Sequence, residues 1–231
     1  MGSKMLRRSG ITVGIVADSL RWKADYVIQV GVGQKHQEVD VLGEEWEGVE
    51  FIGFEACPKI YGDINDEYPG ELYNIAITDF VGRVPFFQKK NHADGSSLHK
   101  IPDQTMQEVE VGASTLDAQF PSNHPVMQGN NILLWLDCEG NELAALQGAT
   151  RLLPKVDMIN VEMTANPPSA DFCSPDDVHK MLLQNGFVRQ WIHTFSSWSG
   201  LYDATYVRRH LFGPSHCCDP ICYQDISECK K

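Results

Sequence analysis

The 231-residue sequence has no apolar run of the ~20 residues that a helix needs to cross a bilayer. It also has no Asn-x-Ser/Thr glycosylation site, no internal repeat and no low-complexity segment. Basic residues are scarce, since 19 Lys and Arg stand against 31 Asp and Glu and give a net charge of -12. Such a balance disfavours non-specific binding to nucleic acid or to an anionic membrane. We therefore expect neither a membrane span nor a nucleic-acid partner.

Cysteine is sparse in the body of the chain and concentrated near its end. Three of the seven cysteines are widely separated (Cys57, Cys138 and Cys173), and the other four lie between residues 217 and 229. The tail spacing does not repeat the paired C-x-x-C of many zinc sites. Reduced thiols in a cytoplasmic protein are the simplest interpretation. Disulfides or a zinc site in the tail remain alternatives.

Composition and patterning predict one main domain. Hydrophobic residues make up 42% of the chain, which is enough for one sizeable core. We divide the chain into a leading helical segment (1–24), a domain (25–212) and a Cys-rich tail (213–231).

Strand-like and helix-like segments alternate along this domain. Such alternation is typical of an α/β fold with a doubly wound, mostly parallel sheet. We expect helices at 11–22, 36–46, from Pro58, after residue 137 and at 174–185 with Ser174 as cap. We expect strands at 25–32, 49–55, 72–78, 83–88, 108–111, 132–137 and 157–162, and a terminal antiparallel hairpin of 187–194 with 204–210.

An acidic group follows the apolar run ILLWL. Asp137, Glu139 and Glu142 come directly after it, and a helical pattern begins at once. Their position is the carboxyl end of a buried strand, where ligands bind in open α/β sheets. Glu162 ends the next strand and is expected to face the same cleft. Buried carboxylates are costly, so such a group is expected to hold a ligand, a cation or a proton.

A glycine-containing loop follows the first strand in VIQVGVGQKH (residues 27–36). Glycines there let the backbone approach a ligand closely. Glu55 ends the second strand, at the place where α/β nucleotide-binding folds hold a ribose diol. The loop alone indicates little because His36 stands where G-x-G-x-x-G needs its third glycine. Loop, acid and strand order together predict a nucleotide-type ligand.

At this point the chain resembles the FkbM-type family of S-adenosylmethionine-dependent methyltransferases, over roughly residues 26–194. The most specific match is the pattern D-x-E-G-x-E-x-x-x-L-x-G-A, which begins at Asp137. The resemblance implies a Rossmann-like class I methyltransferase fold with a seven-stranded sheet and a reversed last strand. The matching segments are VIQVGVG (27–33), FIGFEACP (51–58), NIAITDFVG (74–82), STLDAQF (114–120), LLWLDCEGNELAALQGA (133–149) and INVEM (159–163).

The resemblance also implies roles for single residues. By motif, Gly31 and Gly33 approach the methionine part of the cofactor, Glu55 holds its ribose, and Asp79 lies near its adenine. The chain departs from the family at two places, because Gln29 stands where an acid is common and Lys35 where a third glycine is common. Gln29 can still form hydrogen bonds in the cofactor site, and Lys35 either pairs with the cofactor's carboxylate or points outward.

The resemblance further implies methyl transfer to an oxygen of a small-molecule acceptor, such as a sugar or a natural product. Asp137 or Glu139 is the candidate base. Alternatively, Asp137, Glu139 and Glu142 hold a divalent cation such as Mg²⁺. Two other functions stay open: a non-catalytic binding module on the same scaffold, and a dinucleotide-dependent oxidoreductase. The sequence does not indicate the oligomeric state.

Overall fold

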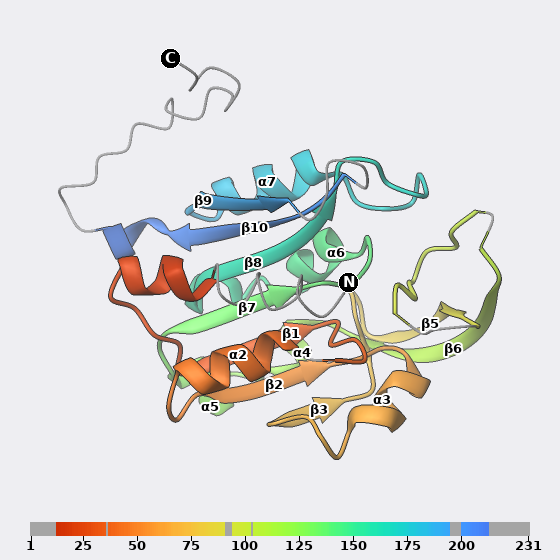
Figure 1. Ribbon diagram of the computed structural model, residues 1–231, viewed down its shortest axis with the longest axis horizontal. Helices are drawn as coiled ribbons and strands as arrows, with labels where there is room; N and C mark the ends of the chain where they lie inside the picture. Colours follow the sequence, from red (N-terminus) through yellow and green to blue (C-terminus); the bar gives the residue numbers. More distant parts are fainter. Residues whose placement is uncertain (1–12, 36, 91–93, 103, 195–199, 213–231) are drawn as a thin grey trace.

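The computed structural model describes residues 13–35, 37–90, 94–102, 104–194 and 200–212. A seven-stranded sheet with the order β3-β2-β1-β7-β8-β10-β9 runs through its centre (Figure 1). The first five of these strands are mutually parallel, and β10 is antiparallel to both of its neighbours. The strands are β1 (Tyr26–Val30), β2 (Glu50–Phe54), β3 (Glu71–Tyr73), β7 (Ile132–Leu136), β8 (Val156–Thr164), β9 (Phe187–Thr194) and β10 (Leu201–Arg208).

Helices cover both faces of this sheet, which explains why its central strand β7 is apolar at every position. All five residues of β7 are buried, as expected for a parallel strand covered on both sides. One face carries a helix at 13–19, α2 (Gln37–Glu45) and α3 (Pro58–Ile64). The other carries α4 (Leu116–Gln119), α5 (Pro125–Gln128), α6 (Glu142–Gln147) and α7 (Pro175–Gln184).

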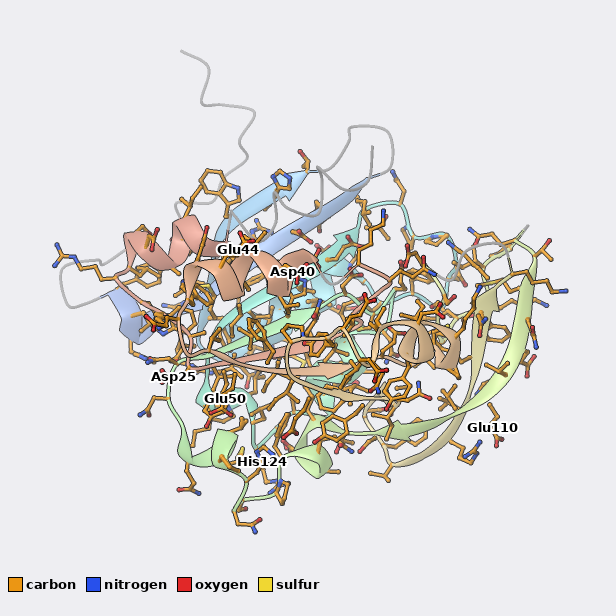
Figure 2. The ribbon with its side chains drawn as sticks, turned by 60° about the horizontal axis from the view of Figure 1, so that its bottom comes forward. Asp25, Asp40, Glu44, Glu50, Glu110 and His124 are labelled. Atoms are coloured by element: carbon orange, nitrogen blue, oxygen red, sulfur yellow. The ribbon has the colours of Figure 1, made fainter. Side chains whose placement is uncertain are left out.

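Charged side chains lie on the outer surfaces of these layers. Asp40 and Glu44 are exposed on α2, and Asp25 and Glu50 are exposed at the amino ends of β1 and β2 (Figure 2). The buried face of α2 carries Val39 and Leu42. The helix is therefore amphipathic, and its apolar side closes one of the two cores.

A second, three-stranded sheet stands beside the carboxyl ends of the main strands. Its order is β4-β6-β5, formed by β4 (Ala76–Ile77), β6 (Met106–Ser114) and β5 (Gly82–Lys89). The expectation of one strand over 72–78 was therefore wrong. Asn74 interrupts it, because its side chain donates to the carbonyl of Glu55 (2.8 Å) and the chain turns there into the second sheet.

The other predicted elements are confirmed with small shifts of their ends. The sheet is doubly wound and mostly parallel, and β9 and β10 form the antiparallel hairpin. Pro58 is the first residue of α3, and Ser174 precedes α7 without a capping hydrogen bond from its side chain. No helix in the described ranges is long and apolar enough to cross a membrane. The segments 1–12 and 213–231, including the tail cysteines, lie outside the described residues.

Candidate active site

A cavity of about 350 Å³ opens at the carboxyl ends of β1, β2 and β7. This volume falls within the range of small-molecule sites, roughly 300–1,000 Å³. The main sheet supplies its floor, and Ile77 of β4 and Phe86 of β5 supply a wall from the second sheet. The location is the one expected for a ligand in a doubly wound fold.

The glycine loop forms one edge of the cavity. Gly31 has a φ of +80°, and a Cβ atom at this position would lie 1.7 Å from the carbonyl oxygen of Asp137. Gly33 has a φ of +68°. Residues that carry a Cβ rarely adopt such backbone angles. Glycine at these positions lets the loop turn sharply and pack against the residues that follow β7.

Glu55 lines the cavity and is also hydrogen-bonded to the loop. Its Oε2 accepts from the backbone N–H groups of Val32 (3.1 Å) and Gly33 (3.0 Å), and its Oε1 accepts from Cys57 (2.7 Å). Burial raises the pKa of Glu55, and these three hydrogen bonds act in the opposite direction. A carboxylate offers about four acceptor positions, so Oε1 keeps room for one more donor.

A distant loop reaches across the cavity to both of its sides. The side chain of Asp94 accepts a hydrogen bond from the backbone N–H of Gln34 (3.1 Å), and the hydroxyl of Ser97 donates to the carbonyl of Glu139 (2.7 Å). Asp94, Gly95, Ser96 and Leu98 all line the cavity. Segment 94–98 thereby connects the glycine loop with the acidic turn after β7.

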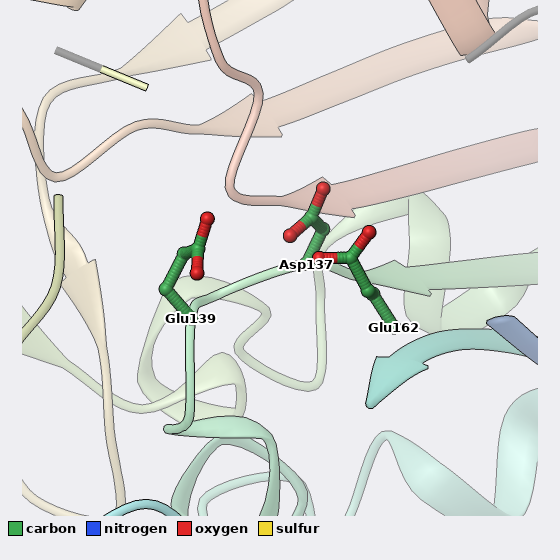
Figure 3. A group of neighbouring side chains, drawn as sticks. All are labelled: Asp137, Glu139 and Glu162. Atoms are coloured by element: carbon green, nitrogen blue, oxygen red, sulfur yellow. The ribbon is translucent and has the colours of Figure 1, made fainter. Parts of the chain in front are cut away.

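Three carboxylates converge at one end of the cavity. Asp137, Glu139 and Glu162 each have a ligand atom within 4.8 Å of the others (Figure 3). Asp137 and Glu162 lie side by side in this group (Figure 3), so each carboxylate experiences the negative charge of the other. Burial, and then the neighbouring negative charge, raises both pKa values well above the usual range.

Glu139 differs from this pair. Burial raises its pKa to about 7, while the nearby charge of Lys89 acts in the opposite direction. The backbone of Glu139 has a φ of 51°, an uncommon value for a residue other than glycine. Strained backbone of this kind costs of order 1–3 kcal/mol and clusters at functional sites.

Glu38 is a fourth acid at this end, which the sequence analysis did not identify. It lies on α2, is buried, and lines the cavity. Burial raises its pKa to about 7. Acids are common in the first turn of a helix because they interact favourably with the helix dipole. The sequence therefore does not distinguish Glu38 from such an acid, and only the tertiary structure shows that it lines the cavity.

Glu142 forms hydrogen bonds within the turn after β7, unlike the other acids of its motif. Its Oε1 accepts from the backbone N–H groups of Cys138 (3.2 Å) and Gly140 (3.0 Å), and its Oε2 accepts from the thiol of Cys173 (3.1 Å). These bonds hold the turn between β7 and α6. The structure thus places Glu162, rather than Glu142, with Asp137 and Glu139.

Two further residues expected at the cofactor are not among those that line the cavity. Gln29 is buried under α2 and α3, where its side-chain oxygen accepts from the hydroxyl of Tyr68 (3.4 Å). Asp79 is exposed, two residues beyond the end of β4. The lining residues in that region are apolar instead: Ile60, Ile75, Ala76 and Ile77.

Comparison with solved structures finds methyltransferases. Magnesium protoporphyrin IX methyltransferase (ChlM) from Synechocystis PCC 6803, solved with bound SAM, is 13% identical, with 87% of this chain and 79% of that chain covered and a TM-score of 0.49. A putative caffeoyl-CoA O-methyltransferase from Staphylococcus aureus is 6% identical (87% and 83% covered, TM-score 0.49). The plantazolicin methyltransferase BpumL in complex with SAH is 10% identical (89% and 84% covered, TM-score 0.47). Similarity at this level carries no information about the acceptor.

A search of curated proteins found no match to the chain. A family model described as methyltransferase FkbM domain, in contrast, matches residues 25–189, more than half of the chain. The match includes the glycine loop, Glu55 and the acidic turn after β7. The chain therefore belongs to the FkbM family of S-adenosylmethionine-dependent methyltransferases.

Proposed function

We propose that this protein transfers a methyl group from S-adenosylmethionine to a hydroxyl oxygen of a small molecule, such as a sugar or a natural product. The observation that carries the proposal is the position of Glu139, a half-buried carboxylate that lines the cavity beside Asp137 and Glu162 and whose pKa is raised by burial to about 7. A general base works best when its pKa lies near the operating pH.

The residues that line the cavity are apolar at one end and acidic at the other, and this arrangement suits the cofactor. Ile60, Ile75 and Ile77 form an apolar end that suits adenine. Glu55 has one free acceptor position for a ribose hydroxyl. The opposite end is acidic and suits the positively charged sulfonium and ammonium groups. When bound, S-adenosylmethionine supplies an activated methyl group.

The acidic end gives the protein a means of handling the proton of the acceptor. Burial and the neighbouring negative charge raise the pKa values of Asp137 and Glu162 well above the usual range, which favours the neutral forms of both groups and makes them weaker candidates for the base. Glu139 ionises near neutral pH and can take the hydroxyl proton as the oxygen approaches the methyl group. A small second pocket shares Glu139 and Glu162 with the cavity, and we place the acceptor on that side.

Calorimetric titration with S-adenosylhomocysteine tests the cofactor assignment. We expect micromolar binding by the wild type and a loss of at least about tenfold in Glu55→Ala, which corresponds to one charge-assisted hydrogen bond. Glu50→Ala is the matched control, because Glu50 is exposed at the other end of the same strand. A urea melt of each variant separates lost binding from lost folding. Absent binding, or preferential binding of NAD, contradicts the proposal and favours the oxidoreductase alternative.

The pH dependence of transfer tests the base. Only ionised Glu139 accepts a proton, so the rate is expected to rise with pH through about 7 and then to level off. Glu139→Gln should lose roughly 10²- to 10⁴-fold in kcat, the usual contribution of a general base, while S-adenosylhomocysteine binding is retained. Radiolabelled methyl transfer to a panel of sugar and phenolic hydroxyls provides the assay. Cofactor binding without transfer to any member would instead support a non-catalytic binding module.

A divalent cation is the alternative to a general base at the same carboxylates. The oxygen atoms of Asp137, Glu139 and Glu162 lie within 4.8 Å of one another, and hard cations take such ligands. A bound cation would lower the pKa of the acceptor hydroxyl itself. Chelation by EDTA distinguishes the two: transfer that persists supports the base, and transfer lost with EDTA and restored by Mg²⁺ supports the cation.

A further inference from the structure

The backbone N–H groups of the glycine loop are already occupied. Those of Val32 and Gly33 donate to Glu55, and that of Gln34 donates to Asp94. The N–H of Gly31 donates to the carbonyl of Phe54 (2.8 Å). Four consecutive N–H groups are therefore hydrogen-bonded within the protein. An anionic group of a ligand at this loop needs a different donor.

The charges around the cavity are strongly unequal. Among the described residues that line it, Lys35 is the only one with a cationic side chain. Lys89 lies nearby, but it does not line the cavity and its charge acts on Glu139. The acidic lining residues are Glu38, Glu55, Asp94, Asp137, Glu139 and Glu162.

The excess of acidic residues affects the two charged groups of the cofactor's amino acid part in opposite ways. Its ammonium group is attracted by the acids, but its carboxylate is repelled by them and finds no free N–H in the loop from Gly31 to Gln34. A carboxylate without a partner in a partly closed cavity is costly. Lys35 stands at the end of this loop, carries three donors and no acceptor, and has the required charge.

We propose that Lys35 binds the α-carboxylate of the cofactor's methionine part and so selects ligands that carry the complete amino acid. The role rests on the proposed function, because it concerns the same cavity. Lys35, which stands where the family pattern has a glycine, is then a cofactor-binding residue of this chain. Lys35 touches the end of the cofactor away from the transferred methyl group, so its effect is on binding rather than on the chemical step.

The test compares two ligands that differ in the group at issue. S-adenosylhomocysteine carries the amino acid, and 5′-methylthioadenosine lacks it. In calorimetric titrations, Lys35→Met is expected to weaken S-adenosylhomocysteine about tenfold and to leave methylthioadenosine unchanged. Lys35→Arg keeps the charge and should restore most of the affinity. Lys155→Met is the matched control, because Lys155 is exposed just before the amino end of β8, away from the cavity at the carboxyl ends.

The outcomes separate this inference from the function on which it rests. Equal weakening of both ligands, or no weakening of either, overturns the role of Lys35 while S-adenosylhomocysteine binding by the wild type still supports a methyltransferase. Failure of the wild type to bind S-adenosylhomocysteine contradicts the proposed function itself. Added salt should reduce the difference between wild type and Lys35→Met, because it screens the charge that the variant removes.

Discussion

At the scale of single residues, Gly31 determines how closely the first loop packs against the acidic turn. We predict that Gly31→Ala lowers the free energy of unfolding by about 3 kcal/mol or more, because its Cβ would collide with the carbonyl of Asp137 at an unfavourable φ. Gly62→Ala is the control, since Gly62 is an exposed helical residue and a Cβ there would have no atom within 4 Å. It should gain about 0.5–1 kcal/mol. Urea denaturation measures both.

Glu38 should make stability depend on pH. Its pKa is about 7 in the folded protein against 4.5 for an exposed glutamate, so the folded state binds the extra proton. Its contribution is therefore most favourable below about pH 4.5 and is lost as the pH rises towards 7. We predict that Glu38→Gln stabilises the ligand-free protein by about 2–3 kcal/mol more at pH 8 than at pH 5. Equal effects at both pH values in urea melts would contradict this.

The sequence identified those cavity residues that directly follow a recognisable strand. Asp137 and Glu139 follow a strongly apolar strand, and both lie in the cavity. Glu142 shares their motif, but its carboxylate accepts from the backbone N–H groups of Cys138 and Gly140. Glu38 and Asp94 come from distant segments. No local pattern marks them, and only the folded chain brings them to the site.

At the scale of elements, Asp117 joins α4 to the turn that follows α6. Its carboxylate accepts from the backbone N–H groups of Arg151 and Leu152 and from the hydroxyl of Thr150. We predict that Asp117→Ala costs about 2 kcal/mol of stability, because these donors lose their acceptor. Cofactor affinity should not change. Asp63→Ala, on the exposed side of α3, should stay within about 0.5 kcal/mol of wild type.

Strands buried on both faces were the easiest elements to predict. β7 is a continuous apolar run with clear ends, and its boundary was placed to within one residue. The segment 72–78 also reads as a continuous run, yet it divides between two sheets at Asn74. That division depends on a hydrogen bond to the end of β2, a contact made across 19 residues that periodicity cannot show.

At the scale of the whole molecule, a ligand that binds only the folded state should raise its stability by mass action. At a concentration of S-adenosylhomocysteine 100 times its Kd, the gain is about 2.7 kcal/mol. For a chain of this size that corresponds to a rise in Tm of roughly 5–10 °C. Differential scanning fluorimetry measures the shift, and adenine alone serves as the control. A Tm that does not respond would contradict occupation of the cavity.

The doubly wound, mostly parallel sheet was predictable because alternation of strands and helices restricts the possible connections. The sequence also indicated that the last two strands pair antiparallel, and β10 does lie between β8 and β9. The second sheet was not predicted as a separate unit, since two of its strands were recognised without their partner. It supplies a wall that partly closes the site at the carboxyl ends of the main strands.

The strained backbone at Glu139 lowers the thermal stability of the protein, although the side chain at this position is the proposed base. At a φ of 51° a glycine is relaxed where a glutamate is strained, and the substitution would also remove a half-buried acid. Glu139→Gly should therefore raise Tm by several degrees while abolishing methyl transfer. If Glu139 is the base as proposed, this strain is a stability cost that the protein accepts for activity.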